Sequence, residues 1–312
     1  MIQVSARGVG GSPHRPQAGL RFTDLSVPVT SDVKLHVRHR AGTASRPFLM
    51  VHGLASNARV WDEVADHLAD AGHPVYAVDL RGHGESDEPA DGYDTGTAVG
   101  DLAAVGAALG LRGAVVAGHS WGGNIALRLA ADHPGLVAGV ALVDGGWIDL
   151  TMAVRTWQEC AAVAAMLRGP AHGSTVDGMR DYLRATHPGW SRAAIEASLA
   201  DMRVEPDGTL TPRPSEPQFM SIIRSLWKDP PTRDYPAVVV PVLMLPAVPS
   251  GNQQWVALVR AWVAAAAAAM ARTTVKWYPD GEHYLQAQHP ERLAHNLLDL
   301  ARAVGPPAAA GQ

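Results

Sequence analysis

The sequence predicts an α/β fold whose central sheet is mostly parallel and is covered by helices on both faces. Apolar runs of strand length alternate with segments of helical periodicity along most of the 312 residues. Such alternation is typical of parallel strands joined by helical crossovers. Hydrophobic residues make up 47% of the sequence and charged residues 18%, which is the balance of a globular protein with a sizeable core.

The expected elements follow one another along the chain. The parallel strands are predicted at Pro47–Val51, Pro74–Asp79, Ala114–His119, Val137–Val143, Pro241–Leu245 and Thr273–Tyr278. Two antiparallel edge strands are predicted at Leu20–Val27 and Val33–Arg40. The helices between and after the strands are predicted at Val60–Ala71, Thr97–Leu109, Gly122–Ala131, Gln254–Ala271 and Pro290–Val304.

One long interval breaks this alternation and predicts an inserted helical cap. It contains helical patterns rather than strands, and a structureless loop of this length would be unusual in a compact domain. Its helices are expected at Met152–Leu167, Val176–Thr186, Arg192–Met202 and Glu216–Trp227. The resulting domain prediction is a flexible leader at 1–18, a core at 19–145 and 238–304, a cap (lid) at 146–237 and a flexible tail at 305–312.

A glycine-rich motif marks the candidate nucleophile. Gly118-His119-Ser120-Trp121-Gly122 matches G-x-S-x-G at the junction of a predicted strand and a predicted helix. The glycines are needed because a side chain two residues before or after the serine would clash in so sharp a turn. The turn exposes Ser120 at the carboxyl end of the sheet. It also directs the first N–H groups of the helix at a substrate oxygen.

With this motif the chain resembles the α/β-hydrolase superfamily over nearly all of residues 20–304. His52-Gly53-Leu54-Ala55 is similar to the family's oxyanion loop, and the segment from Asp79 to Ser86 is similar to its turn after the next strand. The resemblance implies that the backbone N–H groups of Leu54 and Trp121 form the oxyanion hole. We interpret Asp79, Arg81 and His83 as structural residues of a tight glycine-rich loop.

His283 is the candidate base. It lies between the last predicted strand and the final helix, where the resemblance places the catalytic histidine behind a glycine, and an imidazole with a pKa near 6.5 can accept and return a proton at neutral pH. The family most often carries its acid after the strand Pro241–Leu245, but there this chain has Ser250 and no carboxylate before Asp280.

Asp144 is the candidate acid that replaces the missing one. It ends the preceding strand, and the carboxyl ends of neighbouring parallel strands lie side by side. Two branches of the superfamily carry an acid at this position, a class of haloalkane dehalogenases and the zearalenone-type lactonases. The serine nucleophile resembles the lactonase arrangement. The structural alternative is that Asp144 only holds the loop at the junction with the cap.

The predicted function is that of a cofactor-free serine hydrolase acting on a carboxylic ester or lactone. Trp and Met side chains in the cap predict a bulky hydrophobic substrate, for example a zearalenone-like macrolactone, with Trp190, Phe219 and Trp227 as candidate substrate-binding residues. The alternatives are a hydrolase of C–C bonds in diketones and a binding protein or receptor with a vestigial triad. Epoxide hydrolysis and dehalogenation are disfavoured because both use an aspartate nucleophile.

Composition excludes several further classes. The net charge of −4 argues against nucleic-acid binding. The single cysteine, Cys160, allows no disulfide within the chain and is expected to be a packing residue. No His, Asp or Glu cluster has metal-ligand spacing. The N-terminus lacks the apolar core of a secretory signal and no segment suits a membrane span, so a cytoplasmic location is expected. The oligomeric state stays open.

Overall fold

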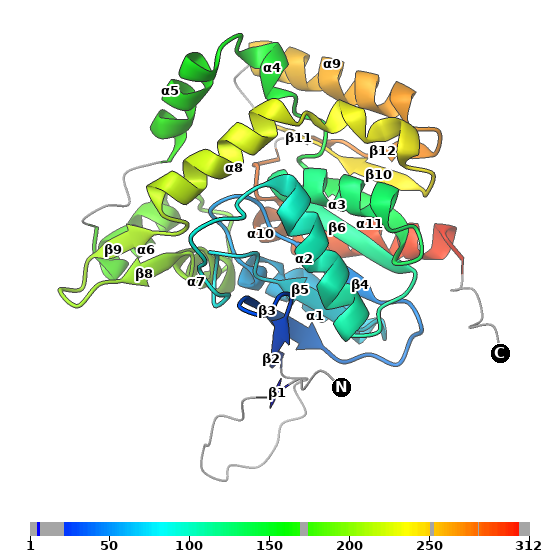
Figure 1. Cartoon of the computed structure of the whole chain (residues 1–312), viewed down its shortest axis with the longest axis horizontal. Helices are drawn as coiled ribbons and strands as arrows, with labels where there is room; N and C mark the ends of the chain where they lie inside the picture. Colours follow the sequence, from blue (N-terminus) through cyan, green and yellow to red (C-terminus); the bar gives the residue numbers. More distant parts are fainter. Residues whose placement is uncertain (1–4, 7–21, 169–173, 250–252, 280, 306–312) are drawn as a thin grey trace.

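A mostly parallel sheet forms the centre of the molecule (Figure 1). The computed structural model describes residues 5–6, 22–168, 174–249, 253–279 and 281–305. Within these residues the order of the main sheet is β1-β2-β3-β5-β4-β6-β7-β10-β12. The strands from β5 to β12 in this order are parallel, and β1 to β3 pair antiparallel. The predicted fold class is confirmed.

The strands closely match the apolar runs of the sequence. Their bounds are β1 Ser5–Ala6, β2 Thr23–Pro28, β3 Lys34–Arg40, β4 Phe48–Val51, β5 Val75–Val78, β6 Ala114–His119, β7 Val137–Val143, β10 Val242–Leu245 and β12 Thr273–Val275. The last predicted run is divided, because β13 (Tyr278–Pro279) leaves the main sheet and pairs with β11 (Ala247–Val248). Ser5 and Ala6, within the predicted flexible leader, pair with β2. Residues 306–312 of the predicted tail lie outside the described residues.

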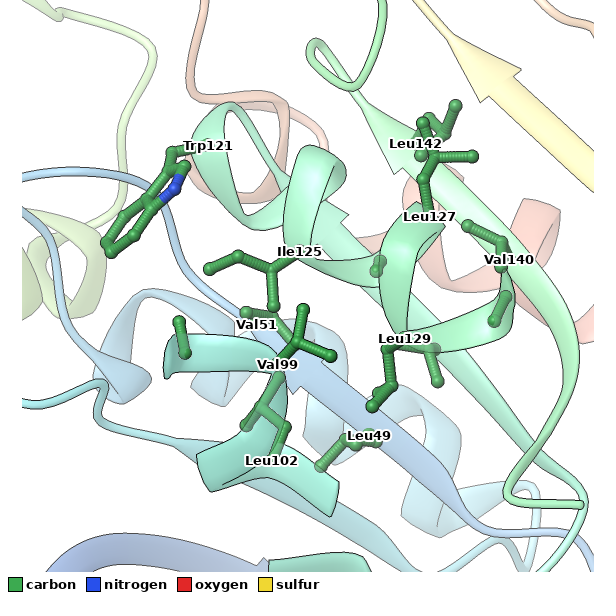
Figure 2. Packing of buried hydrophobic residues seen from close by; sticks show 14 of the residues in the cluster. Leu49, Val51, Val99, Leu102, Trp121, Ile125, Leu127, Leu129, Val140 and Leu142 are labelled. Atoms are coloured by element: carbon green, nitrogen blue, oxygen red, sulfur yellow. The ribbon is translucent and has the colours of Figure 1, made fainter. Parts of the chain in front are cut away.

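Helices cover both faces of the sheet. On one face lie α1 (Asp62–Asp70) and α11 (Pro290–Ala303), and on the other lie α2 (Thr95–Ala108), α3 (Trp121–Asp132) and α9 (Gln253–Ala269). Figure 2 shows α3 packed on the sheet through Ile125 and Leu127, close to Leu49 of β4 and Val140 of β7.

Strand β4 illustrates why the parallel strands are continuous apolar runs. Leu49 and Val51 point into the core under α3, whereas Phe48 and Met50 point into the core under α1 and α11. Successive side chains of a strand face opposite sides of the sheet. A strand that is covered on both faces must therefore be apolar at every position.

The interval between β7 and β10 lies to one side of the sheet in Figure 1. It contains α4 (Leu150–Ala153), α5 (Trp157–Leu167), α6 (Val176–Thr186), α7 (Arg192–Leu199), α8 (Glu216–Lys228), and the hairpin of β8 (Met202–Val204) and β9 (Leu210–Pro212). The one-turn helices η2 (Pro231–Arg233) and η3 (Tyr235–Ala237) lead back to the sheet.

Two predicted boundaries in this interval are wrong. The helix expected at Met152–Leu167 is interrupted, because Thr156 and Glu159 form a capping box that starts a new helix at Trp157. The helix expected at Arg192–Met202 ends at Leu199, and Met202 begins a strand of the hairpin.

The chain leaves β4 and β6 in opposite directions. It continues from β4 to β5 on one side and from β6 to β7 on the other. At such a switch point the carboxyl ends of the strands border a crevice in which open α/β sheets bind ligands. The segments that follow β4, β6 and β7 carry the candidate residues Leu54, Ser120 and Asp144. None of the described helices has the length and apolar character needed to cross a membrane.

Candidate active site

Ser120 occupies a strained turn between β6 and α3. Its φ of 52° and ψ of −119° lie outside the usual regions for an L-residue. A Cβ on Gly118 would come within 2.1 Å of the carbonyl oxygen of Gly122, and a Cβ on Gly122 would come within 2.5 Å of the carbonyl oxygen of Val51. Both glycines are therefore required by close backbone approach, and they let strand and helix meet at Ser120.

The end of β7 lies directly against this turn. The backbone N–H of Ser120 donates to the carbonyl oxygen of Val143 at 3.0 Å. A Cβ on Gly145 would come within 2.2 Å of the carbonyl oxygen of Ser120. Asp144, with a φ of 42°, turns the chain at this point, and Asp is one of the residues that tolerate the left-handed region. Asp144 is thus placed beside the candidate nucleophile.

His283 and Asp144 are in direct contact although 139 residues separate them. The Nδ1–H of His283 donates to Oδ2 of Asp144 at 2.7 Å. The other carboxylate oxygen, Oδ1, accepts the backbone N–H of Ala247 at 3.0 Å. Ala247 belongs to the segment after β10, so the segment expected to carry the usual acid holds Asp144 instead. Ser250 itself lies outside the described residues.

This contact determines which nitrogen of the His283 ring can act as a base. An ionised carboxylate only accepts hydrogen bonds, so Nδ1 carries the proton and Nε2 presents its lone pair. Ser120 and His283 are both described, and no hydrogen bond joins their side chains in this structure. Such contacts commonly tighten only when a substrate is bound.

His119, which directly precedes Ser120, fixes the backbone of His283. Its Nε2–H donates to the carbonyl oxygen of His283 at 2.8 Å, and the centroids of the two rings are 4.6 Å apart. Burial, with the nearby His283, holds the pKa of His119 well below its usual value, so the ring is neutral. His119 thereby joins the end of β6 to the base loop, which we define as residues 281–284.

The segment after β4 runs past Ser120. A Cβ on Gly53 would come within 2.9 Å of the Ser120 Cβ. The segment is held by two buried histidines: Nδ1–H of His52 donates to the carbonyl oxygen of Gly53 at 2.7 Å, and Nε2 of His83 accepts the N–H of Ala55 at 3.3 Å. Leu54 therefore lies between two fixed residues.

Trp121 lies at the first position of α3, immediately after Ser120. The first four N–H groups of a helix have no acceptor within the helix, so the N–H of Trp121 is of the kind that can bind an oxyanion. The side chain is fixed by its Nε1–H, which donates to Oγ1 of Thr95 at 3.1 Å. Figure 2 shows the ring of Trp121 near the end of the buried cluster.

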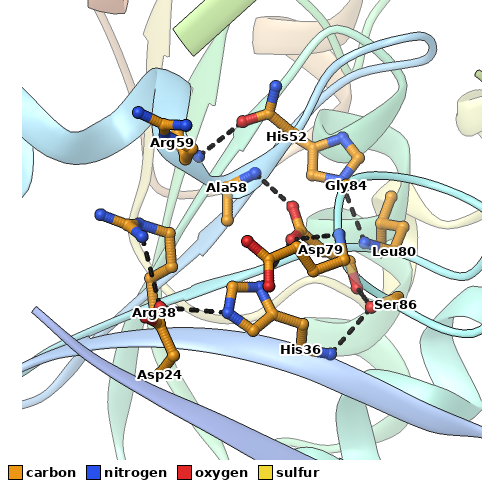
Figure 3. Close-up of polar contacts among 12 residues, drawn as sticks. Asp24, His36, Arg38, His52, Ala58, Arg59, Asp79, Leu80, Gly84 and Ser86 are labelled. Carbon is orange, nitrogen blue, oxygen red and sulfur yellow. Dashed lines mark hydrogen bonds and ion pairs between the residues drawn. The ribbon is translucent and has the colours of Figure 1, made fainter. Parts of the chain in front are cut away.

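Asp79 is the centre of a polar network under this segment (Figure 3). Its Oδ1 accepts the N–H of Ala58 at 2.6 Å, and its Oδ2 accepts from Nδ1 of His36 at 2.7 Å and from the N–H of Glu85 at 3.0 Å. Burial is the largest influence and alone would raise the pKa of Asp79. The hydrogen bond from His36, the charges of His52 and His36 and the N–H of Glu85 together outweigh burial, so the pKa is lowered. These contacts suit the structural role expected for Asp79.

The remaining two residues interpreted as structural in this turn are also held by the fold. Arg81 forms a bidentate ion pair with Asp101 at 2.8 and 2.9 Å, and both side chains are buried. His83 is fully buried, and its Nδ1–H donates to the carbonyl oxygen of Arg81 at 2.9 Å.

Acidification is expected to destabilise the protein through His83. Burial lowers the pKa of His83 from 6.5 to about 3. Between these values the unfolded chain binds a proton that the folded chain does not, so the free energy of unfolding falls as the pH drops below 6.5. At about pH 5 this loss is about 2 kcal/mol. Urea unfolding measures the free energy of unfolding at about pH 7.5 and at about pH 5. The decrease in this free energy between the two pH values should be smaller for His83→Gln than for the wild type. An equal difference would contradict this account.

The three candidate substrate-binding residues are all in the interval between β7 and β10, which we call the cap interval. Trp190 is buried, with one face stacked on His187 at a centroid distance of 4.0 Å. Phe219 is buried on α8, 5.3 Å from the guanidinium of Arg168. Trp227 is half-buried near the end of α8. Their part in binding substrate stays a prediction.

Helix α8 is linked to the elbow through Thr95. The hydroxyl of Ser225 on α8 accepts the N–H of Thr95 at 3.0 Å. The Oγ1 of Thr95 in turn accepts from the Trp121 side chain. The cap interval and the first residue of α3 are therefore joined by two hydrogen bonds.

Two features of the site were not predicted from the sequence. The N–H of Ala247 is a backbone donor, and no side chain in its segment signals it. Glu282 also contributes to the site, and the only hint of this in the sequence is that it directly precedes His283.

Cys160 is buried, in keeping with a packing residue. Among the described residues, no three His, Cys, Asp or Glu side chains are grouped so that they could hold a metal ion.

Comparison with known proteins finds the same fold elsewhere. Residues 46–164 match the family model described as the alpha/beta hydrolase fold. The crystal structure of E-2-(acetamidomethylene)succinate hydrolase is similar with a TM-score of 0.75 and 25% identity, over 90% of this chain and 100% of that one. The chain has the α/β-hydrolase fold.

Curated relatives of this α/β hydrolase include several enzymes. This chain is 29% identical to 2-(acetamidomethylene)succinate hydrolase of Mesorhizobium japonicum over 280 residues, which are 86% of this chain and 92% of that protein. It is 44% identical to a non-heme chloroperoxidase of Streptomyces lividans over 98 residues, 31% of this chain and 36% of the relative. A thioesterase domain from the curacin biosynthetic pathway, with a TM-score of 0.69 and 20% identity over 89% of this chain and 99% of that chain, shares the fold.

Proposed function

We propose that this α/β hydrolase is a cofactor-free serine hydrolase that cleaves the carboxylic ester or lactone of a bulky hydrophobic substrate. The contact between His283 and Asp144, at the carboxyl end of the strands beside Ser120, is the observation that carries the proposal. A serine in a strained strand-to-helix turn and a carboxylate-oriented imidazole are the parts that nucleophilic acyl transfer needs.

The reaction would proceed through an acyl-enzyme. The Oγ of Ser120 attacks the substrate carbonyl carbon while Nε2 of His283 takes the hydroxyl proton. The carbonyl oxygen becomes an oxyanion and accepts the N–H groups of Leu54 and Trp121. The bond to the leaving alkoxide then breaks, and the proton passes from Nε2 to the leaving oxygen. Water repeats the sequence with His283 as base, which releases the acid and restores Ser120.

Asp144 would keep His283 in the useful tautomer throughout this cycle. Its Oδ2 stabilises the imidazolium that forms when Nε2 takes the proton. Its Oδ1 is held by Ala247, so the carboxylate is fixed in direction. An acid directly after β7 can serve in this way because it reaches Nδ1, the ring nitrogen that does not react.

Hydrolysis of a C–N bond is a second candidate. The relative that matches over 86% of this chain is named as a hydrolase of 2-(acetamidomethylene)succinate, which carries an acetamido group. The same serine, histidine and aspartate would form an acyl-enzyme, with nitrogen as the leaving atom. Cleavage of a diketone C–C bond would use the same triad, whereas a binding protein with a vestigial triad would turn over no substrate.

A substrate panel tests the proposal. It contains p-nitrophenyl esters of increasing chain length, a macrolactone, 2-(acetamidomethylene)succinate and a β-diketone. Each compound is assayed with the wild type and with a serine-knockout control. Serine-dependent hydrolysis of the long-chain esters or the macrolactone supports the proposal. Turnover of only the acetamido compound favours C–N hydrolysis, turnover of only the diketone favours C–C hydrolysis, and no turnover at all favours the binding protein.

The aromatic side chains of α8 are expected to control substrate range. Phe219→Ala and Trp227→Ala should each raise KM for a long-chain ester several-fold, because removed aromatic area weakens apolar binding. Activity on p-nitrophenyl acetate should persist. Trp255→Ala is the control, since this ring packs on Trp262 of its own helix, α9. Unchanged selectivity in both α8 variants would show that α8 does not border the substrate.

A further inference from the structure

Glu282 joins the base loop to the cap interval. Its Oε2 accepts from Nδ1 of His187 at 2.5 Å and from Nε1–H of Trp190 at 3.1 Å. These donors lie between α6 and α7, more than ninety residues earlier in the chain. The backbone N–H of Glu282 donates to Oε1 of Gln288, beyond the base loop, at 2.7 Å. Glu282 is thus held from both sides.

The rings behind Glu282 continue this connection as far as the nucleophile strand. Trp190 stacks on His187, and its edge meets the ring of Tyr284 at a centroid distance of 5.5 Å. Tyr284 in turn contacts the ring of His119 at 5.0 Å. His119 immediately precedes Ser120. A continuous series of rings therefore runs from the cap interval, past the base loop, to the elbow.

Helix α7, which follows Trp190, is fastened to the core near both ends. The hydroxyl of Ser191 donates to Oε2 of Glu63 on α1 at 2.7 Å. Near the opposite end, Nδ2 of Asn57 donates to the carbonyl oxygen of Ala197 at 2.8 Å and to the Asp201 carboxyl group. The donors to Glu282 therefore belong to an anchored segment.

We propose that Glu282 is a positioning residue that holds the base loop in register with Ser120 by accepting hydrogen bonds from His187 and Trp190. This inference rests on the proposed function, because it assigns His283 as the base. Glu282 precedes His283 directly, so a displacement of its backbone moves the imidazole.

The carboxylate of Glu282 is the group that sets this position. It joins the loop to the anchored segment through His187 and Trp190, while His119 and Asp144 make separate hydrogen bonds to His283. A shift of about 1 Å in a reacting group can cost about 100-fold in rate. Loss of the carboxylate should therefore lower kcat more than it raises KM.

The test compares three variants. Glu282→Ala removes both hydrogen bonds and should lower kcat roughly 10- to 100-fold with KM changed less than about threefold. Glu282→Gln keeps an acceptor oxygen and should recover most of the loss. Glu88→Ala is the matched control, because Oε2 of Glu88 accepts from Arg203 of β8 and so also joins the core to the cap interval, but without contacting the base loop. This variant should leave kcat within about twofold of the wild type.

The rate at which an organophosphonate serine probe labels the protein gives an independent readout, and it should fall in parallel with kcat. Trp190→Phe keeps an aromatic ring but lacks the N–H donor. It should lower kcat by less than Glu282→Ala, and should add nothing when combined with it, because the two changes remove a shared contact. Trp190→Phe alone keeps the proposal testable if Glu282→Ala does not fold, because it removes one of the two hydrogen bonds to Glu282 and should lower kcat more than it raises KM. An unchanged kcat in Trp190→Phe would then contradict the positioning role.

Three results would overturn the proposal. They are a kcat for folded Glu282→Ala within threefold of the wild type, an equal loss in Glu88→Ala, or additive losses for Glu282→Ala and Trp190→Phe. Failure of the proposed function is recognised separately, because the wild type would then not be labelled at Ser120. Normal labelling of Ser120, with an unchanged rate in Glu282→Ala, refutes the positioning role alone.

Discussion

Ser120→Ala is expected to lower kcat by about 10⁶-fold on the substrate that the panel identifies, which is the typical cost of losing the nucleophile of a triad. Alanine leaves His283 with no group to activate, while the turn and the oxyanion donors remain. Single-turnover assays of the purified variant measure the residual rate. Its thermal unfolding should resemble that of the wild type, since the side chain makes no hydrogen bond that the described fold depends on.

The matched control for this variant is Ser86→Ala. Ser86 is also in a loop after a parallel strand, but its hydroxyl donates to the backbone of Asp79. The Ser86→Ala variant should be less stable than the wild type and should keep the wild-type kcat. If Ser120→Ala retained more than about 1% of the wild-type rate, another nucleophile would be acting.

Asp144→Asn is expected to lower kcat by about 10⁴-fold, as removal of the orienting carboxylate does in known triads. The asparagine oxygen can still accept the N–H of Ala247, so the fold is preserved. Its neutral amide cannot stabilise the imidazolium of His283. The amide nitrogen can also select the wrong tautomer, in which Nε2 carries the proton. The kcat on the identified substrate, measured at several pH values, checks this prediction.

Asp149→Asn provides the control for the loss of a carboxylate close by in sequence. Asp149 is buried, and it caps α4 by accepting the N–H of Thr151 at 2.9 Å. Asp149 makes no hydrogen bond to His283. The kcat of Asp149→Asn should therefore stay within about threefold of the wild-type value. Near-wild-type activity of Asp144→Asn would show that His283 works without this acid.

The sheet could be predicted from the sequence because its strands are buried on both faces. Continuous apolar runs such as Val137–Val143 have few alternative uses in a chain with this much helical periodicity. The elbow could be predicted because close backbone approach permits only glycine at positions 118 and 122. The candidate acid was accessible by elimination, since the segment from Leu243 to Asp280 contains no carboxylate before its last residue.

The hairpin of β8 and β9 was missed although the sequence contains a signal for it. Each strand has three residues, too few to show alternation. The turn Glu205-Pro206-Asp207-Gly208 is nevertheless typical of tight turns, with Pro setting φ and Gly taking a positive φ, here 82°. The start of α5 was similarly marked by Thr156 and Glu159, which form a capping box.

The contacts that position His283, the proposed base, could not be predicted from the sequence. His119, Glu282 and the N–H of Ala247 act through partners that are distant along the chain. Neither periodicity nor spacing encodes such pairs, because they form only when the strands and the cap interval are assembled. The identity of the substrate could not be predicted for the same reason, because selectivity depends on how side chains of the cap interval pack.

Peptide mapping after treatment with an organophosphonate serine probe tests the central claim most directly. The claim is that Ser120 is a nucleophile activated by His283 and Asp144. The account predicts one adduct per chain, on Ser120, that forms rapidly in the wild type, forms far more slowly in Asp144→Asn and His283→Ala, and is absent in Ser120→Ala. An unlabelled wild type, or labelling of Ser120 at the same rate in Asp144→Asn and His283→Ala, would contradict it.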